Sequence, residues 1–169
     1  QLLEDGTIAA FVGWEAGRFD KQTTPLVCLT PDDTDRLVFN EYCANNLAKY
    51  VLDLKQRGKI GLCVRGCDSR AVNRMVQDNQ FSRDDVYLIG LPCPQMRDRK
   101  TDAVLNKCTY CRHRNPVTSD ELIGEQGEEQ DSSRFAEVER LERMTPEERF
   151  AFWRGELSRC IRCNACRNV

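Results

Sequence analysis

The chain has 169 residues, 40% of them hydrophobic, which suffices for one ordinary domain with a buried core, or for a domain with an appendage. Its 25 basic and 27 acidic side chains nearly cancel, so the net charge is -2 and nothing suggests the basic stripe that a nucleic-acid partner usually needs. No apolar run approaches the roughly 18 residues that cross a bilayer, so we expect no membrane span.

Ten cysteines are the most informative feature of the composition. They could form a disulfide framework in a secreted domain or ligate metal in a reducing compartment. Disulfides mostly stabilise chains too short for a core, and this chain is not short. The cysteines also occur in tight groups, which suits thiolates that converge on one inorganic centre: Cys63/Cys67, Cys108/Cys111 and Cys160/Cys163/Cys166. We therefore predict metal or cluster ligation, and with it a cytoplasmic location.

Hydrophobic periodicity predicts the fold class. Short apolar segments bounded by Gly, Pro and Asp predict strands at 7–13, 25–30, 59–65 and 86–90. One helix is expected from Asn40 to Gln56, capped by Asn40 and ended by Gly58, and a second from an N-cap at Asp68 to about Asp78. Strands that alternate with helices are typical of parallel crossover units, so residues 1–123 are predicted to form an α/β domain with a Rossmann-like parallel sheet and flanking helices.

After the fourth strand the periodicity is lost. Residues 94–120 are polar and cysteine-bearing, and we predict a loop that metal ligation would have to order. A solvated linker follows at 124–133 and a helical arm at 134–159, in which Thr145–Glu148 forms a capping box with proline at the first helical position. The arm leads into the start of a ferredoxin-like module at 160–169.

Four cysteines are candidates for one shared site. Cys67 follows the third strand at the start of a helix, and Cys93 follows the fourth strand, at the edge of an open α/β sheet where ligands bind. The loop adds the pair Cys108 and Cys111. Four thiolates would close a 4Fe-4S site, and zinc could use the same four ligands.

The other cysteines of this region have a simpler interpretation. Cys28, Cys43 and Cys63 are expected to be small buried hydrophobic residues, and Cys63, in the middle of a strand, is expected to pack under a helix. His113, the only histidine, is expected to be a surface residue, with a role in tuning a nearby cluster as the alternative.

Four arginines gather near the proposed site in sequence. Arg65, Arg70, Arg112 and Arg114 form either a solvated basic rim or a set of charges that compensates a negatively charged cluster or an anionic cofactor. Both interpretations stay open at the level of sequence.

Three further thiols recur at every third position at the end of the chain. Cys160, Cys163 and Cys166 match the opening of the bacterial iron-sulfur string C-x2-C-x2-C-x3-C-P. The fourth cysteine of that string would follow Val169 directly, so we expect the chain to be an internal piece of a longer polypeptide. The triplet is then expected to be an incomplete ferredoxin-type site, disordered or empty in this piece.

These motifs resemble a known family. The segments Gly61–Arg70, Ile89–Cys93, Cys108–Pro116 and Arg159–Arg167 resemble the beta subunits of deazaflavin (coenzyme F-420) hydrogenases and dehydrogenases, and are similar to iron-sulfur relatives associated with heterodisulfide reductase complexes. The resemblance implies an electron-transfer adaptor that works with other redox subunits through 4Fe-4S clusters. Several members also hold a flavin, so FAD is a further cofactor that the resemblance implies. In those beta subunits the ferredoxin-like module commonly precedes the α/β domain, whereas in this chain the triplet follows it.

Three functional classes follow from the sequence. The chain is expected to be an iron-sulfur electron-transfer subunit of an anaerobic oxidoreductase complex. The alternatives are a flavin-containing reductase subunit whose clusters feed FAD, and a zinc-stabilised structural or interaction module. No set of nucleophile, base and acid is evident, so no catalytic residue is predicted.

Overall fold

In the computed structural model, which describes residues 1–129 and 134–167, the chain divides into an α/β unit over residues 1–132 and a helical unit over residues 133–169. Positions 130–133 of the predicted linker and 168–169 of the predicted ferredoxin-like module lie outside the described residues. The elements of the first unit, in chain order, are β1 (Ala10–Ala16), β2 (Thr23–Cys28), the 3-10 helix η1 (Pro31–Arg36), α1 (Tyr50–Leu54), η2 (Lys55–Arg57), β3 (Ile60–Val64), α2 (Gly66–Gln77), η3 (Arg83–Asp85), β4 (Val86–Gly90), α3 (Asn106–Thr109) and β5 (Glu121–Leu122).

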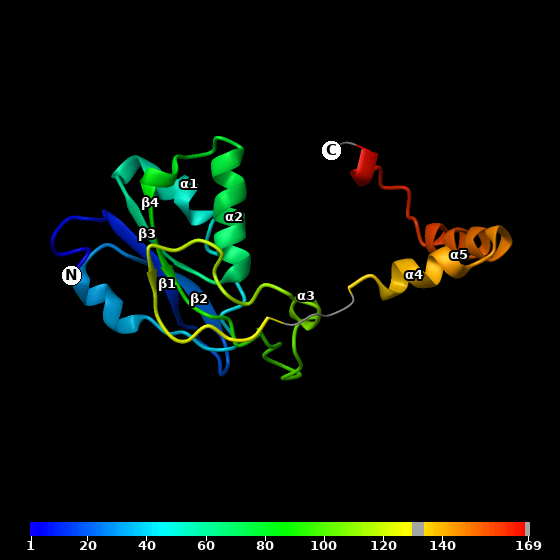
Figure 1. Cartoon of the computed structure of the whole chain (residues 1–169), viewed down its shortest axis with the longest axis horizontal. Coiled ribbons are helices and arrows are strands. Elements are labelled where there is room, and N and C mark those ends of the chain that lie inside the picture. The colour runs from blue at the N-terminus through cyan, green and yellow to red at the C-terminus, as the bar shows by residue number, and fades with distance from the viewer. Residues whose placement is uncertain (130–133, 168–169) are drawn as a thin grey trace. The chain divides into compact units, whose positions relative to one another are not determined.

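The strands form one sheet in the order β2-β1-β3-β4-β5 (Figure 1). β1, β3, β4 and β5 run parallel, and β2 alone is antiparallel, paired with β1. The α/β class and the mostly parallel sheet with flanking helices are thus confirmed. The predicted parallel unit between the strands at 25–30 and 59–65 is wrong, because β2 turns back on β1 through a short loop closed by the hydrogen bond from Gly17 N to Gln22 O, 2.7 Å. Such a loop can join antiparallel strands but is too short for a crossover.

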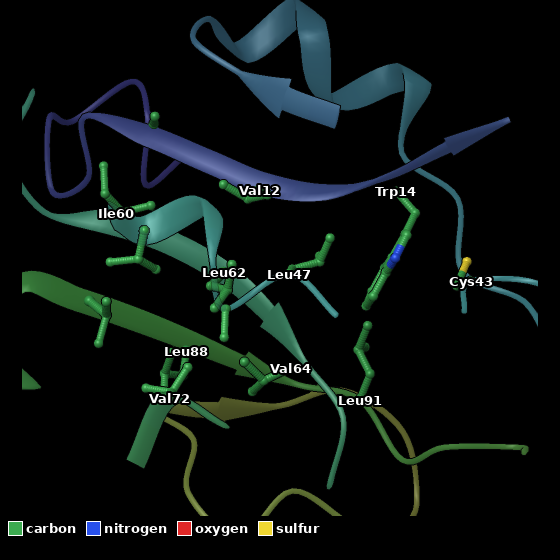
Figure 2. Packing of buried hydrophobic residues seen from close by; sticks show 14 of the residues in the cluster. Val12, Trp14, Cys43, Leu47, Ile60, Leu62, Val64, Val72, Leu88 and Leu91 are labelled. Atoms are coloured by element: carbon green, nitrogen blue, oxygen red, sulfur yellow. The ribbon is translucent and has the colours of Figure 1, made fainter. Parts of the chain in front are cut away.

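Alternating side chains give the sheet two different faces. On β4, Val86 and Leu88 join a large cluster that also contains Val51 of α1 and Val72 of α2. Figure 2 shows side chains from β1, β3 and β4 pointing into this layer. Tyr87 belongs to a smaller cluster on the other face. Helices α1 and α2 therefore pack on one face of the sheet, and strand alternation sends the other side chains to the opposite face.

The predicted helix from Asn40 to Gln56 is mostly absent, and only its last part forms α1. The side chain of Asn40 accepts a hydrogen bond from Tyr42 N (2.9 Å), and the side chain of Asn46 accepts one from Ala48 N (3.0 Å). These contacts fold the backbone into turns, the known competitor of helix at asparagine. Cys43, Leu47 and Val51 of this segment are nevertheless buried, so the helical spacing of the apolar residues indicated burial rather than a helix.

A buried ion pair joins the end of β3 to the start of α2. Arg65 and Asp68 are 1% and 0% exposed, and Arg65 Nε donates to Asp68 Oδ2 over 2.6 Å. The rest of the guanidinium donates to the backbone carbonyls of Cys43 and Asn45 and lies 4.8 Å from the ring centroid of Trp14. Trp14 Nε1 in turn donates to Asn45 O over 3.2 Å. The pair thus ties β1, β3, α2 and the 43–45 turn together.

The helical unit contains α4 (Ala136–Arg143), α5 (Pro146–Ser158) and the 3-10 turn η4 (Ala165–Arg167). The predicted capping box is confirmed: Thr145 Oγ1 accepts from Glu148 N, and Glu148 Oε2 accepts from Thr145 N. Arg149 donates to three carbonyls at the end of α4. Within the described residues, no helix is both long and apolar enough to cross a membrane.

The Arg65–Asp68 pair yields a stability prediction. Arg65→Met should lower the free energy of unfolding by about 3 to 5 kcal/mol, because it leaves the Asp68 carboxylate buried without a counter-charge. The measurement is chemical denaturation of the full chain. The double variant Arg65→Met/Asp68→Asn should recover part of this loss.

The control is Arg74→Met, which breaks the exposed pair with Asp78 on α2. Exposed pairs contribute about 0 to 1 kcal/mol, so this variant should change little. Equal effects of Arg65→Met and Arg74→Met would contradict the role given to the buried pair.

Candidate metal centre

The parallel pairing of β3 and β4 brings the first two candidate cysteines to one edge of the sheet. Val64 and Gly90, the last residues of these strands, are partners in register. Cys67 and Cys93 each follow their strand end by three residues, and the hydrogen bond from Leu91 N to Val64 O, 2.8 Å, continues the pairing outward. The sheet therefore brings both residues to the same edge, where they line one cavity.

Helix α2 begins earlier than the sequence predicts. The N-cap is Arg65 rather than Asp68, and Asp68 is the third residue of the helix, where its carboxylate accepts from Arg65 N over 3.1 Å. This is the reach-back half of a capping box. As a result Cys67 lies inside the first turn of α2, in a helix that is fixed by the buried ion pair.

All four predicted ligands line one cavity of about 120 Å³. Cys67, Cys93, Cys108 and Cys111 share its wall with Arg65, Gln95, Met96, Lys107, His113 and Arg114. All ten cysteines of the chain are free thiols. In the part of the chain that the structure describes, no three Cys, His, Asp or Glu side chains are grouped as ligands of a single metal ion.

The cysteine-bearing loop is fastened at several points by its own hydrogen bonds. Lys107 Nζ donates to the carbonyl of Ala44 (2.8 Å), and Gln95 Nε2 donates to the carbonyl of Cys108 (3.2 Å). The carbonyl of Arg114 accepts from Cys93 N (3.0 Å). The loop was predicted to need metal ligation for its order. These hydrogen bonds hold it in place in addition to any ligation.

Gly66 allows the loop to approach the start of α2. A Cβ atom at this position would lie 2.1 Å from the carbonyl oxygen of His113 and 2.8 Å from that of Asn115. Farther along, Val117 N donates to Ser69 Oγ of α2 over 3.1 Å. The glycine thus permits the backbone contact that sets Cys67 against the loop carrying Cys111.

Burial favours the protonated form of Cys67 and Cys93 when no metal is bound. Burial, with a smaller effect of Asp68, raises the pKa of the Cys67 thiol to about 11, although the residue as a whole is exposed. Burial likewise raises the pKa of Cys93. Ligation must therefore release protons, so metal affinity should rise with pH.

The remaining cysteines of the first unit are packing residues. Cys28 and Cys43 are fully buried, as predicted, and burial raises the pKa of Cys28 to about 11. Cys63 is half-buried in the middle of β3 and contacts both hydrophobic clusters rather than lying under one helix. Burial raises its pKa to about 12.

The structure separates the charged residues near the site. Arg65 is buried and paired with Asp68, so it is no part of a solvated rim, whereas Arg70 is exposed. His113 lines the cavity, but 44% of its side chain is exposed and its Nδ1 lies 3.7 Å from Glu129 Oε1. Sequence reasoning missed Gln95, Met96 and Lys107, which have no recognisable sequence signal. It also missed the burial of Arg65, which the acidic Asp68 three positions later could have indicated.

The terminal triplet has a different character. Cys160, Cys163 and Cys166 are all exposed. Arg162 and Asn164, which lie between them, adopt left-handed backbone conformations with φ of 56° and 60°. Such residues turn the chain sharply, and Arg162 N donates to Cys160 Sγ over 3.4 Å. The three thiols thus occupy an irregular, tightly turning segment.

Comparison with solved structures shows the same type of fold in a redox complex. The chain is similar to a chain of the F420-reducing [NiFe] hydrogenase complex from Methanosarcina barkeri, with 23% identity and a TM-score of 0.50, over 59% of this chain and 36% of that one. The chain thus spans about a third of the length of this relative. At this identity the likeness shows the fold alone. No protein-family model and no curated protein matches the sequence.

Gly66→Ala should loosen the loop, because the added methyl group meets backbone that cannot rotate away. Hydrogen exchange in the metal-free chain should accelerate at the amides of Cys93 and Val117, which bond to Arg114 O and Ser69 Oγ. The matched control is Gly155→Ala in α5, where a methyl group meets nothing within 4 Å. Unchanged exchange in Gly66→Ala would contradict the close approach.

Cys67 should show a high apparent pKa in the metal-free chain. Because the thiolate is the nucleophile, its alkylation rate should rise about tenfold per pH unit from pH 8 to about pH 10. Mass spectrometry of the Cys67 peptide measures this rate, and free cysteine, whose pKa is about 8.5, is the reference. A plateau at Cys67 at the same pH as in free cysteine would show that the cavity does not desolvate the thiol.

Proposed function

We propose that this chain is an iron-sulfur electron-transfer subunit of an anaerobic oxidoreductase complex. The observation that carries the proposal is the arrangement of Cys67, Cys93, Cys108 and Cys111 around one cavity. These cysteines come from two adjacent strand ends and one loop, so positions far apart in sequence line one cavity. Convergence of this kind is hard to explain by packing alone.

The residues present fit a 4Fe-4S cluster. The donor set consists of four thiols, the soft ligands that iron-sulfur clusters and zinc prefer. The cavity of about 120 Å³ that these residues line offers room for a bound group.

The chain's own residues prepare the site for a group that carries negative charge. When bound, a cluster supplies one-electron exchange. Arg65 holds the first turn of α2 and thereby Cys67, while Met96, 1% exposed, limits water on the inner wall. Lys107 and Arg114 add positive charge to the lining. Burial and charge of this kind are the means by which a protein sets a cluster's potential.

The terminal triplet supports the same class of function. Its spacing is that of three ligands of a ferredoxin-type cluster, and its backbone turns between successive thiols. We propose that Cys160, Cys163 and Cys166 ligate a second cluster together with a fourth ligand from elsewhere.

The proposal includes partners of the same chemistry. Likeness in fold to a chain of a hydrogenase complex supports membership of a multi-subunit redox assembly. We propose that other redox subunits deliver and accept the electrons. FAD and zinc remain the alternatives to be tested, since the family resemblance implies the first and the ligand set admits the second.

The decisive measurement is iron, sulfide, zinc and flavin per chain after anaerobic preparation. Cys67→Ala and Cys108→Ala should each lose about four irons per chain, since each removes a ligand of the same cluster. The matched control is Cys28→Ala, a buried cysteine outside the cavity, which should keep its iron.

A colourless chain with stoichiometric zinc would refute the electron-transfer function and support the zinc-stabilised structural or interaction module. Flavin released on denaturation would favour the reductase alternative. Iron contents of Cys67→Ala and Cys108→Ala equal to that of the unaltered chain would refute the four-ligand site.

A further inference from the structure

Arg114 stands where two cavities meet. It lines the four-cysteine cavity and also a larger, neighbouring cavity of about 610 Å³. Cys93 is the one candidate ligand that lines both, and its backbone N–H donates to the carbonyl of Arg114 over 3.0 Å. The larger cavity is also lined by Pro92, Pro94, Asn115, Glu125, Gly127, Glu128 and Glu129.

The side chain of Arg114 keeps an unused donor. Its Nε is buried and has no hydrogen-bond partner within the described part of the chain, residues 1–129 and 134–167. Buried polar groups almost always have a partner, so each exception needs a reason. The other two cations of the four-cysteine cavity differ in this respect: Arg65 bonds to Asp68, and Lys107 bonds to the carbonyl of Ala44.

The acceptors of the larger cavity leave the Nε–H unpaired. This cavity carries Glu125, Glu128 and Glu129, and none of these carboxylates accepts a hydrogen bond from Arg114 Nε. The four-cysteine cavity contains thiols that become negatively charged acceptors as soon as they ligate metal. The effective dielectric constant inside a protein is lower than in water, and this strengthens a hydrogen bond to charged sulfur.

We propose that Arg114 donates its Nε–H to sulfur of the cluster site, with the Cys93 thiolate as the acceptor, and thereby raises the reduction potential of the cluster. This inference rests on the proposed function, because it requires a cluster in the cavity. The sign follows from charge: a donor and a cation beside the cluster stabilise the form that carries the additional electron. Arg114 does not hold the metal but sets how readily the centre accepts an electron.

The test is a redox titration of the iron-loaded full chain, followed by electron paramagnetic resonance of the reduced cluster. Arg114→Gln removes both the charge and the Nε–H, and Arg114→Lys keeps the charge but lacks the Nε–H. Both should shift the ratio of reduced to oxidised cluster roughly tenfold toward the oxidised form, which is 59 mV for a one-electron couple. Arg70→Gln, an exposed arginine of α2 outside the cavity lining, should leave the potential unchanged.

Each outcome decides between the explanations. A potential unchanged in Arg114→Lys but lowered in Arg114→Gln would mean that charge alone acts, and unchanged potentials in both would overturn the inference. If either variant fails to retain iron, the unaltered chain prepared with ¹⁵Nε-labelled arginine decides, since a ¹⁵N coupling to the reduced cluster is expected and its absence overturns the proposal. Iron present with no such coupling refutes this inference alone, whereas a chain without iron refutes the proposed function.

Discussion

The buried pair of Arg65 and Asp68 is the constraint on which the site depends. Removing two charges from water is costly, and the cost is offset only where the remaining hydrogen bonds are satisfied. The structure meets this condition with the carbonyls of Cys43 and Asn45 and with the face of Trp14. Because these partners come from separate segments, the guanidinium of the pair is fully satisfied only when β1, β3 and the 43–45 turn are in place, and Cys67 is then positioned with them.

The sequence predicted those parts of the fold that depend on local pattern. β3 and β4 were found because short apolar runs flanked by turn residues leave few alternatives. The direction of β2 was missed, since periodicity says nothing about pairing partners. The helix expected at Asn40 failed for a different reason: Asn40 and Asn46 bond to nearby backbone and stop the helix, while Arg65 takes two carbonyls of the same segment. The contacts of Arg65 span 20 residues or more, so no rule based on local sequence predicts them.

The candidate site was predictable to the extent that topology delivers it. The rule that ligands bind beyond the carboxyl ends of parallel strands was enough to place Cys67 beside Cys93. The finer structure rests on contacts between distant residues. From the sequence, Gly66 would be interpreted as an ordinary turn residue. In the structure, its missing side chain lets the His113 carbonyl approach the start of α2. The unpartnered Nε of Arg114 has no sequence signature either, because an unmet hydrogen bond is a property of the folded surroundings.

The two cysteine groups differ in how the chain can control them. Around Cys67 the protein supplies burial, cationic side chains and long-range packing, which in the proposed function would act on the energy of an added electron. The triplet from Cys160 to Cys166 is exposed and shaped by local backbone turns, and the donor that the structure gives it is the amide of Arg162. Side-chain substitutions in this chain should therefore act far more on the first centre than on the second. In the proposed function, the centre at the sheet edge is the one whose potential this chain sets.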